Sequence, residues 1–135
     1  MPCKGTEPGL DTNIEAMLRQ RYVNYFSVVV ADTYQDSAYA TASQILARNS
    51  SSNAQIPVAE PRLRASGKVA ALLTALSKTK DQADVYAFVD SDARIPPNWL
   101  AELVDPLIDE SVGATTGFRW CFPLQGGVWS HLEAA

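Results

Sequence analysis

Two aspartates that follow an apolar segment are the residues best suited to chemistry. Asp90 and Asp92 come directly after residues 85–89 (VYAFV), a composition typical of a buried parallel strand. In open α/β sheets, ligands bind just beyond the carboxyl ends of the strands. Two carboxylates one residue apart in such a turn can share Mg²⁺ or Mn²⁺, which keep positions open for substrate phosphates. We therefore expect metal-assisted departure of a diphosphate here, although an isolated D-x-D more often caps a turn.

A lysine at the start of a predicted helix is a second candidate for anion binding. Gly67 and Lys68 open a strongly apolar helical pattern. The spacing excludes a Walker motif, because Arg62 stands where that motif needs its first glycine. A positive side chain and free backbone N–H groups at a helix start suit an anionic ligand, so we expect Lys68 beside a pocket for such a ligand. Arg62 and Arg64 could assist a diphosphate or could be solvated surface charges.

The elements that position these residues alternate between helical and strand periods. This alternation predicts an α/β fold with a mostly parallel sheet flanked by helices. Helices are expected over residues 11–20, 37–48, 67–77, from Pro96 or Pro97 through Val104, and over 127–133. Strands are expected over residues 26–31, 56–59, 85–89 and 112–118. Asp11 or Thr12 is the expected N-cap of the first helix.

Composition limits the classes of protein to consider. The 135 residues fit one domain and carry a net charge of -4 without a run of Lys or Arg, which argues against a nucleic-acid partner. Cys3 and Cys121 match no zinc or redox spacing and are expected to be reduced thiols. His131 is the only histidine, so a Ser–His or Cys–His catalytic pair has few ways to form. No stretch approaches the roughly 18–20 apolar residues of a membrane span.

Five segments of the chain occur in the order seen in family 2 and family 21 glycosyltransferases: PCKGTEPGLDTNIEAML, VVVADTYQD, RASGKVAALLTAL, FVDSDARIPPNWLAELV and VGATTGFRW. Over nearly its whole length the chain resembles the ceramide glucosyltransferase-like group. The resemblance implies a GT-A (Rossmann-like) fold, a UDP-sugar donor such as UDP-glucose and a divalent metal, Mn²⁺ or Mg²⁺. It also implies transfer with inversion to a lipid acceptor, a sphingolipid precursor such as ceramide.

The resemblance gives roles to individual residues. Asp32 matches the first family aspartate, which contacts the uracil or ribose, and an acceptor-only carboxylate suits an N–H or a hydroxyl there. Asp32 as a mere helix or turn cap is the alternative. Glu7 matches an acidic position near the nucleoside, Lys68 and Asp90 complete the donor site, and Asp90 with Asp92 would hold the metal. Asp36 falls where many relatives also have aspartate, and a local capping role is equally open for it.

The chain also departs from these relatives. Their catalytic aspartate and a Q-x-x-R-W-type motif lie well downstream of the D-x-D, and the R-W of residues 119–120 comes too early to match. No general base is therefore assigned. Relatives have an apolar strand before P-C-K-G, usually preceded by a membrane anchor, with the catalytic domain in the cytosol. We expect residues 1–135 to be the donor-binding part of a longer enzyme, with Trp120 and Phe122 nearest to an acceptor.

Two other functions remain open at this point. A nucleotidyltransferase would share a related sheet and metal-binding aspartates, but its Gly-rich basic signature is poorly matched by CKGTEPG. A catalytically inactive nucleotide-sugar-binding module would keep the same binding residues without transferring a sugar.

Overall fold

Short parallel strands form the middle layer of the molecule. The computed structural model describes residues 1–49 and 53–118. The strands are β1 (Pro2–Cys3), β2 (Ser27–Val28), β3 (Val30–Ala31) and β4 (Ala54–Gln55). β1 pairs in parallel with β3, and β2 pairs in parallel with β4. β2 and β3 are separated by Val29 alone, so residues 27–31 run between β1 on one side and β4 on the other.

The hydrogen bonds of this middle run alternate between its two neighbours. Ser27 and Val29 donate to the carbonyl oxygens of Asn53 and Gln55 at 2.9 and 3.0 Å, whereas Val30 donates to Met1 at 2.9 Å. The ladder with β4 continues only as an isolated bridge between residues 31 and 58, because Pro57 has no N–H to donate. The strand predicted over residues 56–59 therefore begins earlier, at residues 54–55, and within the predicted range only the bridge at residue 58 forms.

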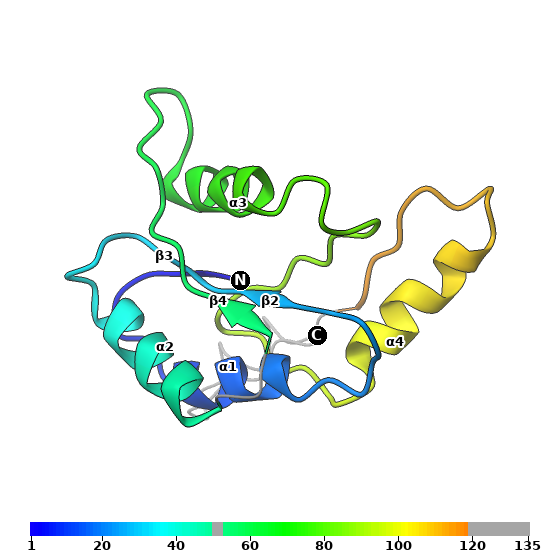
Figure 1. The fold of residues 1–135 in the computed structure, drawn as a ribbon, viewed down its shortest axis with the longest axis horizontal. Coiled ribbons are helices and arrows are strands. Elements are labelled where there is room, and N and C mark those ends of the chain that lie inside the picture. The colour runs from blue at the N-terminus through cyan, green and yellow to red at the C-terminus, as the bar shows by residue number, and fades with distance from the viewer. Residues whose placement is uncertain (50–52, 119–135) are drawn as a thin grey trace, which may run out of the picture.

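Helices cover both faces of the strands. In Figure 1, α1 (Leu10–Leu18) and α2 (Ser37–Arg48) lie on one side and α3 (Gly67–Lys78) lies on the other. α1 connects β1 to the middle run, and α2 connects that run to β4, so each helix is the crossover between parallel strands that a βαβ unit requires. The mixed α/β architecture with helices flanking short parallel strands agrees with the prediction, and the predicted helix 37–48 is confirmed at both ends.

The start of α1 differs from the prediction. Gly9 is the N-cap, with φ of 79° in the left-handed region, where a glycine meets no steric penalty. Neither Asp11 nor Thr12 is the N-cap, because both lie inside the first turn. The Asp11 carboxylate instead accepts a hydrogen bond from the Thr12 N–H at 2.8 Å.

Successive residues of the middle run face the two helical layers. Val29 belongs to the core cluster with α1 and α2, and Ile14 at its centre is fully buried. The other face meets α3, where Thr74 is also fully buried. Its hydroxyl donates to the Ala70 carbonyl and accepts from the Glu60 N–H, both at 2.9 Å, so this buried polar group is satisfied.

The segment predicted as a strand directly before Asp90 forms no strand. A groove of about 450 Å³ lies between it and β2, lined by Phe26 and Val28 on one side and residues 85–89 on the other. Backbone pairing needs strands about 4.8 Å apart, and the two segments that border the groove do not pair. Phe88 is 54% exposed, so the prediction of a buried strand is wrong, although Val89 does join the core.

The C-terminal elements also differ from expectation. α4 (Trp99–Val104) begins two residues after Pro97 and continues as a 3₁₀ helix, η1 (Asp105–Ile108). Residues 112–118 form no strand, and neither sheet includes them; Thr115 instead donates to the Leu103 carbonyl at 2.6 Å. The helix expected over residues 127–133 lies outside the described residues.

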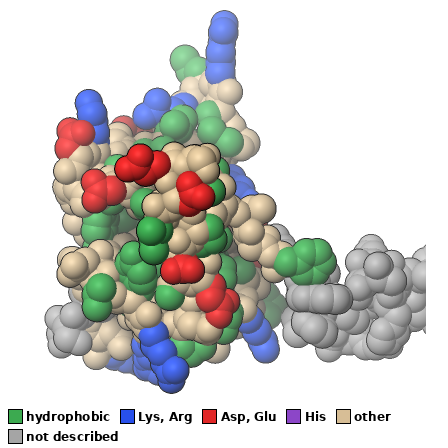
Figure 2. Space-filling model, turned by 90° about the vertical axis from the view of Figure 1, so that its right-hand side faces the viewer, with side chains coloured by type: hydrophobic (Ala, Val, Ile, Leu, Met, Phe, Trp, Pro, Cys, Tyr) green, Lys and Arg blue, Asp and Glu red, His purple; other side chains and the backbone are tan. Residues whose placement is uncertain are grey.

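The surface on the α4 side is acidic and partly apolar. Figure 2 shows acidic side chains at its centre, with hydrophobic side chains among them and most Lys and Arg nearer the edges. In residues 1–49 and 53–118, no helix is both long enough and apolar enough to span a membrane.

Candidate functional site

A hollow lined by several charged residues lies where the ends of β1 and β3 meet the start of α3. Its volume is about 360 Å³. The lining consists of residues after β1 and β3, the first turns of α3 and the turn that follows residue 89: Pro2, Cys3, Lys4, Glu7, Asp32, Gly67, Lys68, Ala71, Asp90, Ser91 and Asp92. All five site residues predicted from the sequence are among them. Segments far apart along the chain therefore converge on one site.

The strands explain why two of these residues are neighbours. β1 ends at Cys3 and β3 ends at Ala31, and the two residues are partners in the parallel register. Parallel strands have their carboxyl ends at the same edge of a sheet, so Lys4 and Asp32 emerge side by side. Their side chains form an ion pair, with 2.8 Å between Lys4 Nζ and Asp32 Oδ2. The hydrogen bond to this carboxylate raises the pKa of the Lys4 ammonium above its ordinary value of 10.5.

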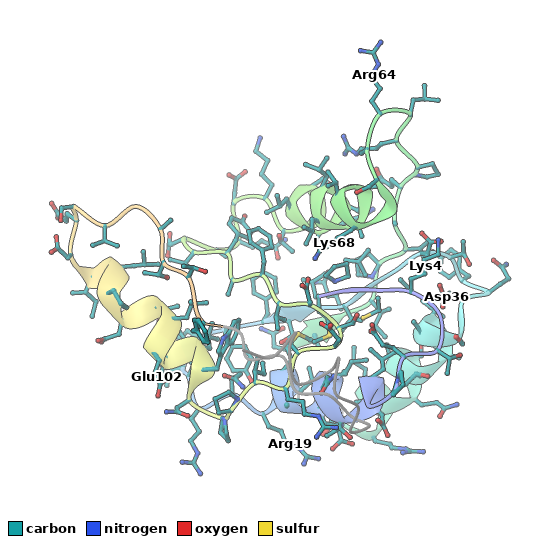
Figure 3. The ribbon with its side chains drawn as sticks, turned by 180° about the vertical axis from the view of Figure 1, so that it is seen from behind. Lys4, Arg19, Asp36, Arg64, Lys68 and Glu102 are labelled. Atoms are coloured by element: carbon teal, nitrogen blue, oxygen red, sulfur yellow. The ribbon has the colours of Figure 1, made fainter. Side chains whose placement is uncertain are left out.

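A second ion pair joins α3 to the aspartate turn. Lys68 is the second residue of α3, and its Nζ lies 2.5 Å from Asp90 Oδ1. In Figure 3, Lys68 projects from α3 towards the strands. The hollow thus contains four carboxylates and two ammonium groups, a surplus of two negative charges. That surplus favours a divalent cation at this site.

The turn that carries Asp90 and Asp92 is fixed to α1. The Ala93 N–H donates to the Asp90 carbonyl at 3.2 Å and closes the turn. Asn13, which is 2% exposed, donates from Nδ2 to the Ser91 carbonyl at 2.8 Å. The two aspartates therefore occupy a turn held by a buried side chain from another element.

The residues of this turn are suited to a metal that takes its other ligands from a substrate. Among the described residues, no three His, Cys, Asp or Glu side chains gather closely enough to hold an ion by themselves. Mg²⁺ is usually bound through one or two carboxylates together with substrate phosphates and water. Asp90 and Asp92 line the same hollow and offer such hard oxygen ligands.

Comparison with known families adds to this geometry. The family model of glycosyl transferase family 21 matches residues 1–135. The chain belongs to glycosyl transferase family 21. This confirms the resemblance to the ceramide glucosyltransferase family, and membership implies transferase activity. Comparison with curated proteins and with solved structures gave no match.

Several other residues of this family 21 glycosyltransferase lie away from the hollow. Arg62 and Arg64 are exposed and do not line it, and Figure 3 shows Arg64 at the tip of a projecting loop. Asp36 is the N-cap of α2, since its carboxylate accepts from the Ala38 N–H at 2.9 Å and from the Gly5 N–H at 2.8 Å. Trp99 packs against the core.

The other residues discussed from the sequence lie outside the described residues: Trp120, Cys121, Phe122 and His131. We assign no general base within residues 1–49 and 53–118.

The sequence did not single out two residues that shape the site, Lys4 and Asn13. Asn13 shares its helix face with Leu10, Ile14 and Met17, all of them buried. A polar residue in an apolar stripe is the signal that could have revealed it. Lys4 follows β1 as Asp32 follows β3, but β1 is too short to be recognised from its two residues.

Proposed function

We propose that the hollow binds the nucleotide-sugar donor of a GT-A glycosyltransferase, a UDP-sugar such as UDP-glucose, together with Mn²⁺ or Mg²⁺. The observation that carries the proposal is the convergence of Glu7, Asp32, Lys68, Asp90 and Asp92 on one hollow in a family 21 chain. The acceptor is a lipid such as ceramide, and transfer inverts the anomeric carbon. We further propose that the enzyme works at a membrane, because its acceptor is a lipid, and that its catalytic domain is anchored there in the cytosol, as the family resemblance implies.

Each residue has a distinct role in donor binding. Asp32 accepts a hydrogen bond from the uracil N–H or a ribose hydroxyl, and Glu7 lies near the same nucleoside. Lys68 neutralises part of the diphosphate charge, assisted by the first N–H groups of α3, which have no partner within the helix. Asp90 and Asp92 hold the cation, which when bound stabilises the charge that develops on the departing UDP.

Calorimetry of the chain with UDP tests the donor site. We expect binding in Mn²⁺ and much weaker binding in EDTA, because the surplus negative charge of the hollow repels a free diphosphate. No binding of UDP in Mn²⁺ would overturn the proposal. Supplying UDP-glucose, Mn²⁺ and ceramide then tests transfer, read out as glucosylceramide by mass spectrometry. Donor binding without transfer would indicate a nucleotide-sugar-binding module that is inactive by itself.

A further inference from the structure

The two carboxylate oxygens of Asp32 have different surroundings. Oδ2 lies 2.8 Å from Lys4 Nζ in the ion pair that joins the ends of β1 and β3. The Lys4 side chain is 74% exposed and that of Asp32 is 33% exposed, so the carboxylate is the more buried partner of the pair. The ion pair therefore restrains the rotation of a carboxylate that is itself already half-buried.

The other oxygen, Oδ1, faces the first residue of α3. A Cβ atom built on Gly67 would lie 3.7 Å from Asp32 Oδ1, at ordinary van der Waals distance. Because Gly67 has no side chain, the space beside Oδ1 stays open to the hollow that both residues line. A side chain longer than that of alanine would extend past this contact and obstruct the oxygen.

We propose that Lys4 is a positioning residue for nucleoside recognition, because its ion pair on Oδ2 holds Asp32 with Oδ1 directed to the nucleoside. The inference rests on the proposed donor site and assigns within it a residue with no role so far. Lys4 acts through Asp32, and therefore contributes equally to binding of uridine and of UDP. A lysine that contacted the diphosphate directly would contribute to UDP binding alone.

The test compares uridine and UDP binding, measured by calorimetry in Mn²⁺, for the chain and for Lys4→Met. We expect both affinities to fall by the same factor, about three- to fivefold, the modest loss expected when an exposed ion pair is removed. Lys4→Arg should restore both affinities, since it keeps a cation at this position. In an Asp32→Asn background, Lys4→Met should have no further effect on uridine binding, as expected of residues that act as a unit.

One control variant and one further variant are measured in the same way. Lys80→Met makes the same charge change at an exposed lysine outside the hollow and should leave both affinities unchanged. Gly67→Val obstructs Oδ1 without removing the ion pair and should also weaken uridine binding. Thermal unfolding of each variant confirms that it is folded.

The outcomes separate this inference from the proposed function. If the unchanged chain binds UDP but Lys4→Met leaves uridine binding intact, the positioning role is overturned and the donor site stands. A fall in UDP affinity alone would instead place Lys4 on the diphosphate. If the unchanged chain binds neither uridine nor UDP, the donor site itself is wrong, and the role of Lys4 fails with it.

Discussion

Asn13 Nδ2 donates a 2.8 Å hydrogen bond to the carbonyl oxygen of Ser91, a residue 78 positions further along the chain. The bond ties α1 to the turn between Asp90 and Asp92. The donor is 2% exposed, and the Asn13 Oδ1 atom is buried with no hydrogen-bond partner. A buried acceptor without a partner destabilises the fold. The hydrogen bond from Asn13 to the turn must therefore offset the stability lost at Oδ1.

Replacing Asn13 with alanine should loosen the aspartate turn. We expect the affinity for UDP in Mn²⁺ to fall at least threefold, because the two carboxylates are no longer held in place. The free energy of unfolding should fall by less than about 2 kcal/mol, since the substitution also removes the unsatisfied oxygen. Calorimetry and urea unfolding measure the two quantities. An unchanged affinity for UDP would show that the turn keeps its shape without α1.

Replacing both Asp90 and Asp92 with asparagine should abolish Mn²⁺-dependent UDP binding while the fold survives. The stability change should stay within about 0.5 kcal/mol, because Asp92 is exposed, Asp90 is partly exposed and the ion pair with Lys68 lies near the surface. Asp81→Asn with Asp84→Asn is the matched control, with the same charge change outside the hollow. UDP binding that still depends on Mn²⁺ in the Asp90/Asp92 variant would rule out the metal assignment.

Local sequence signals predicted where most of the helices lie and singled out part of the candidate site. α2 was predicted at both ends because its apolar spacing begins directly after a capping aspartate, Asp36. Asp90 and Asp92 were singled out because they follow an apolar run, and Lys68 because it opens a predicted helix. Glu7 and Asp32 were chosen from the family resemblance, and all five line the hollow. Local signals act within a few residues of the position that they describe, so they predict the structure correctly where tertiary contacts do not override them.

The predictions from the sequence failed where tertiary contacts determine the local structure. Residues 85–89 have a strand composition, but a strand also needs a neighbouring strand with which to pair. The sequence of these five residues does not indicate that a groove lies between them and β2. The start of α1 depended on the left-handed backbone of Gly9, which competed with the better capping side chain of Asp11. The pairing of Lys4 with Asp32 required the register of β1 on β3, which two-residue strands do not reveal.

Ile14→Ala should destabilise the protein strongly. Its side chain is fully buried between α1, α2 and the middle strands, so truncation leaves a cavity in the core. We expect a loss of about 2–5 kcal/mol in urea unfolding. Val23 is 76% exposed, and Val23→Ala should change stability by no more than about 0.5 kcal/mol. Similar losses in the two variants would show that α1 does not pack as described.

Cys3 should make the stability of the protein depend on pH in the alkaline range. The thiol is 5% exposed, and burial raises its pKa from 9.0 to about 11, with smaller contributions from the nearby carboxylates of Glu7 and Asp36. In the unfolded chain the thiol loses its proton near pH 9, whereas in the folded protein it keeps the proton until about pH 11. The raised pKa therefore leaves the free energy of unfolding unchanged below pH 9, and this free energy falls as the pH rises from 9 to 11.

The measurement compares urea unfolding of two proteins at several pH values, one with Cys3 and one with Cys3→Ala, both carrying Cys121→Ser. The substitution at Cys3 changes core packing by an amount that does not depend on pH, and all other titrating groups are common to both proteins. The difference between their free energies of unfolding should therefore be constant below pH 9. By pH 11 the protein with Cys3 should have lost about 1–3 kcal/mol of stability relative to the protein with Cys3→Ala. A difference that stays constant up to pH 11 would mean that the thiol ionises as readily in the folded state as in the unfolded chain. In that case Cys3 would be open to solvent through the hollow that it lines, and iodoacetamide would modify it in the folded protein as fast as in urea.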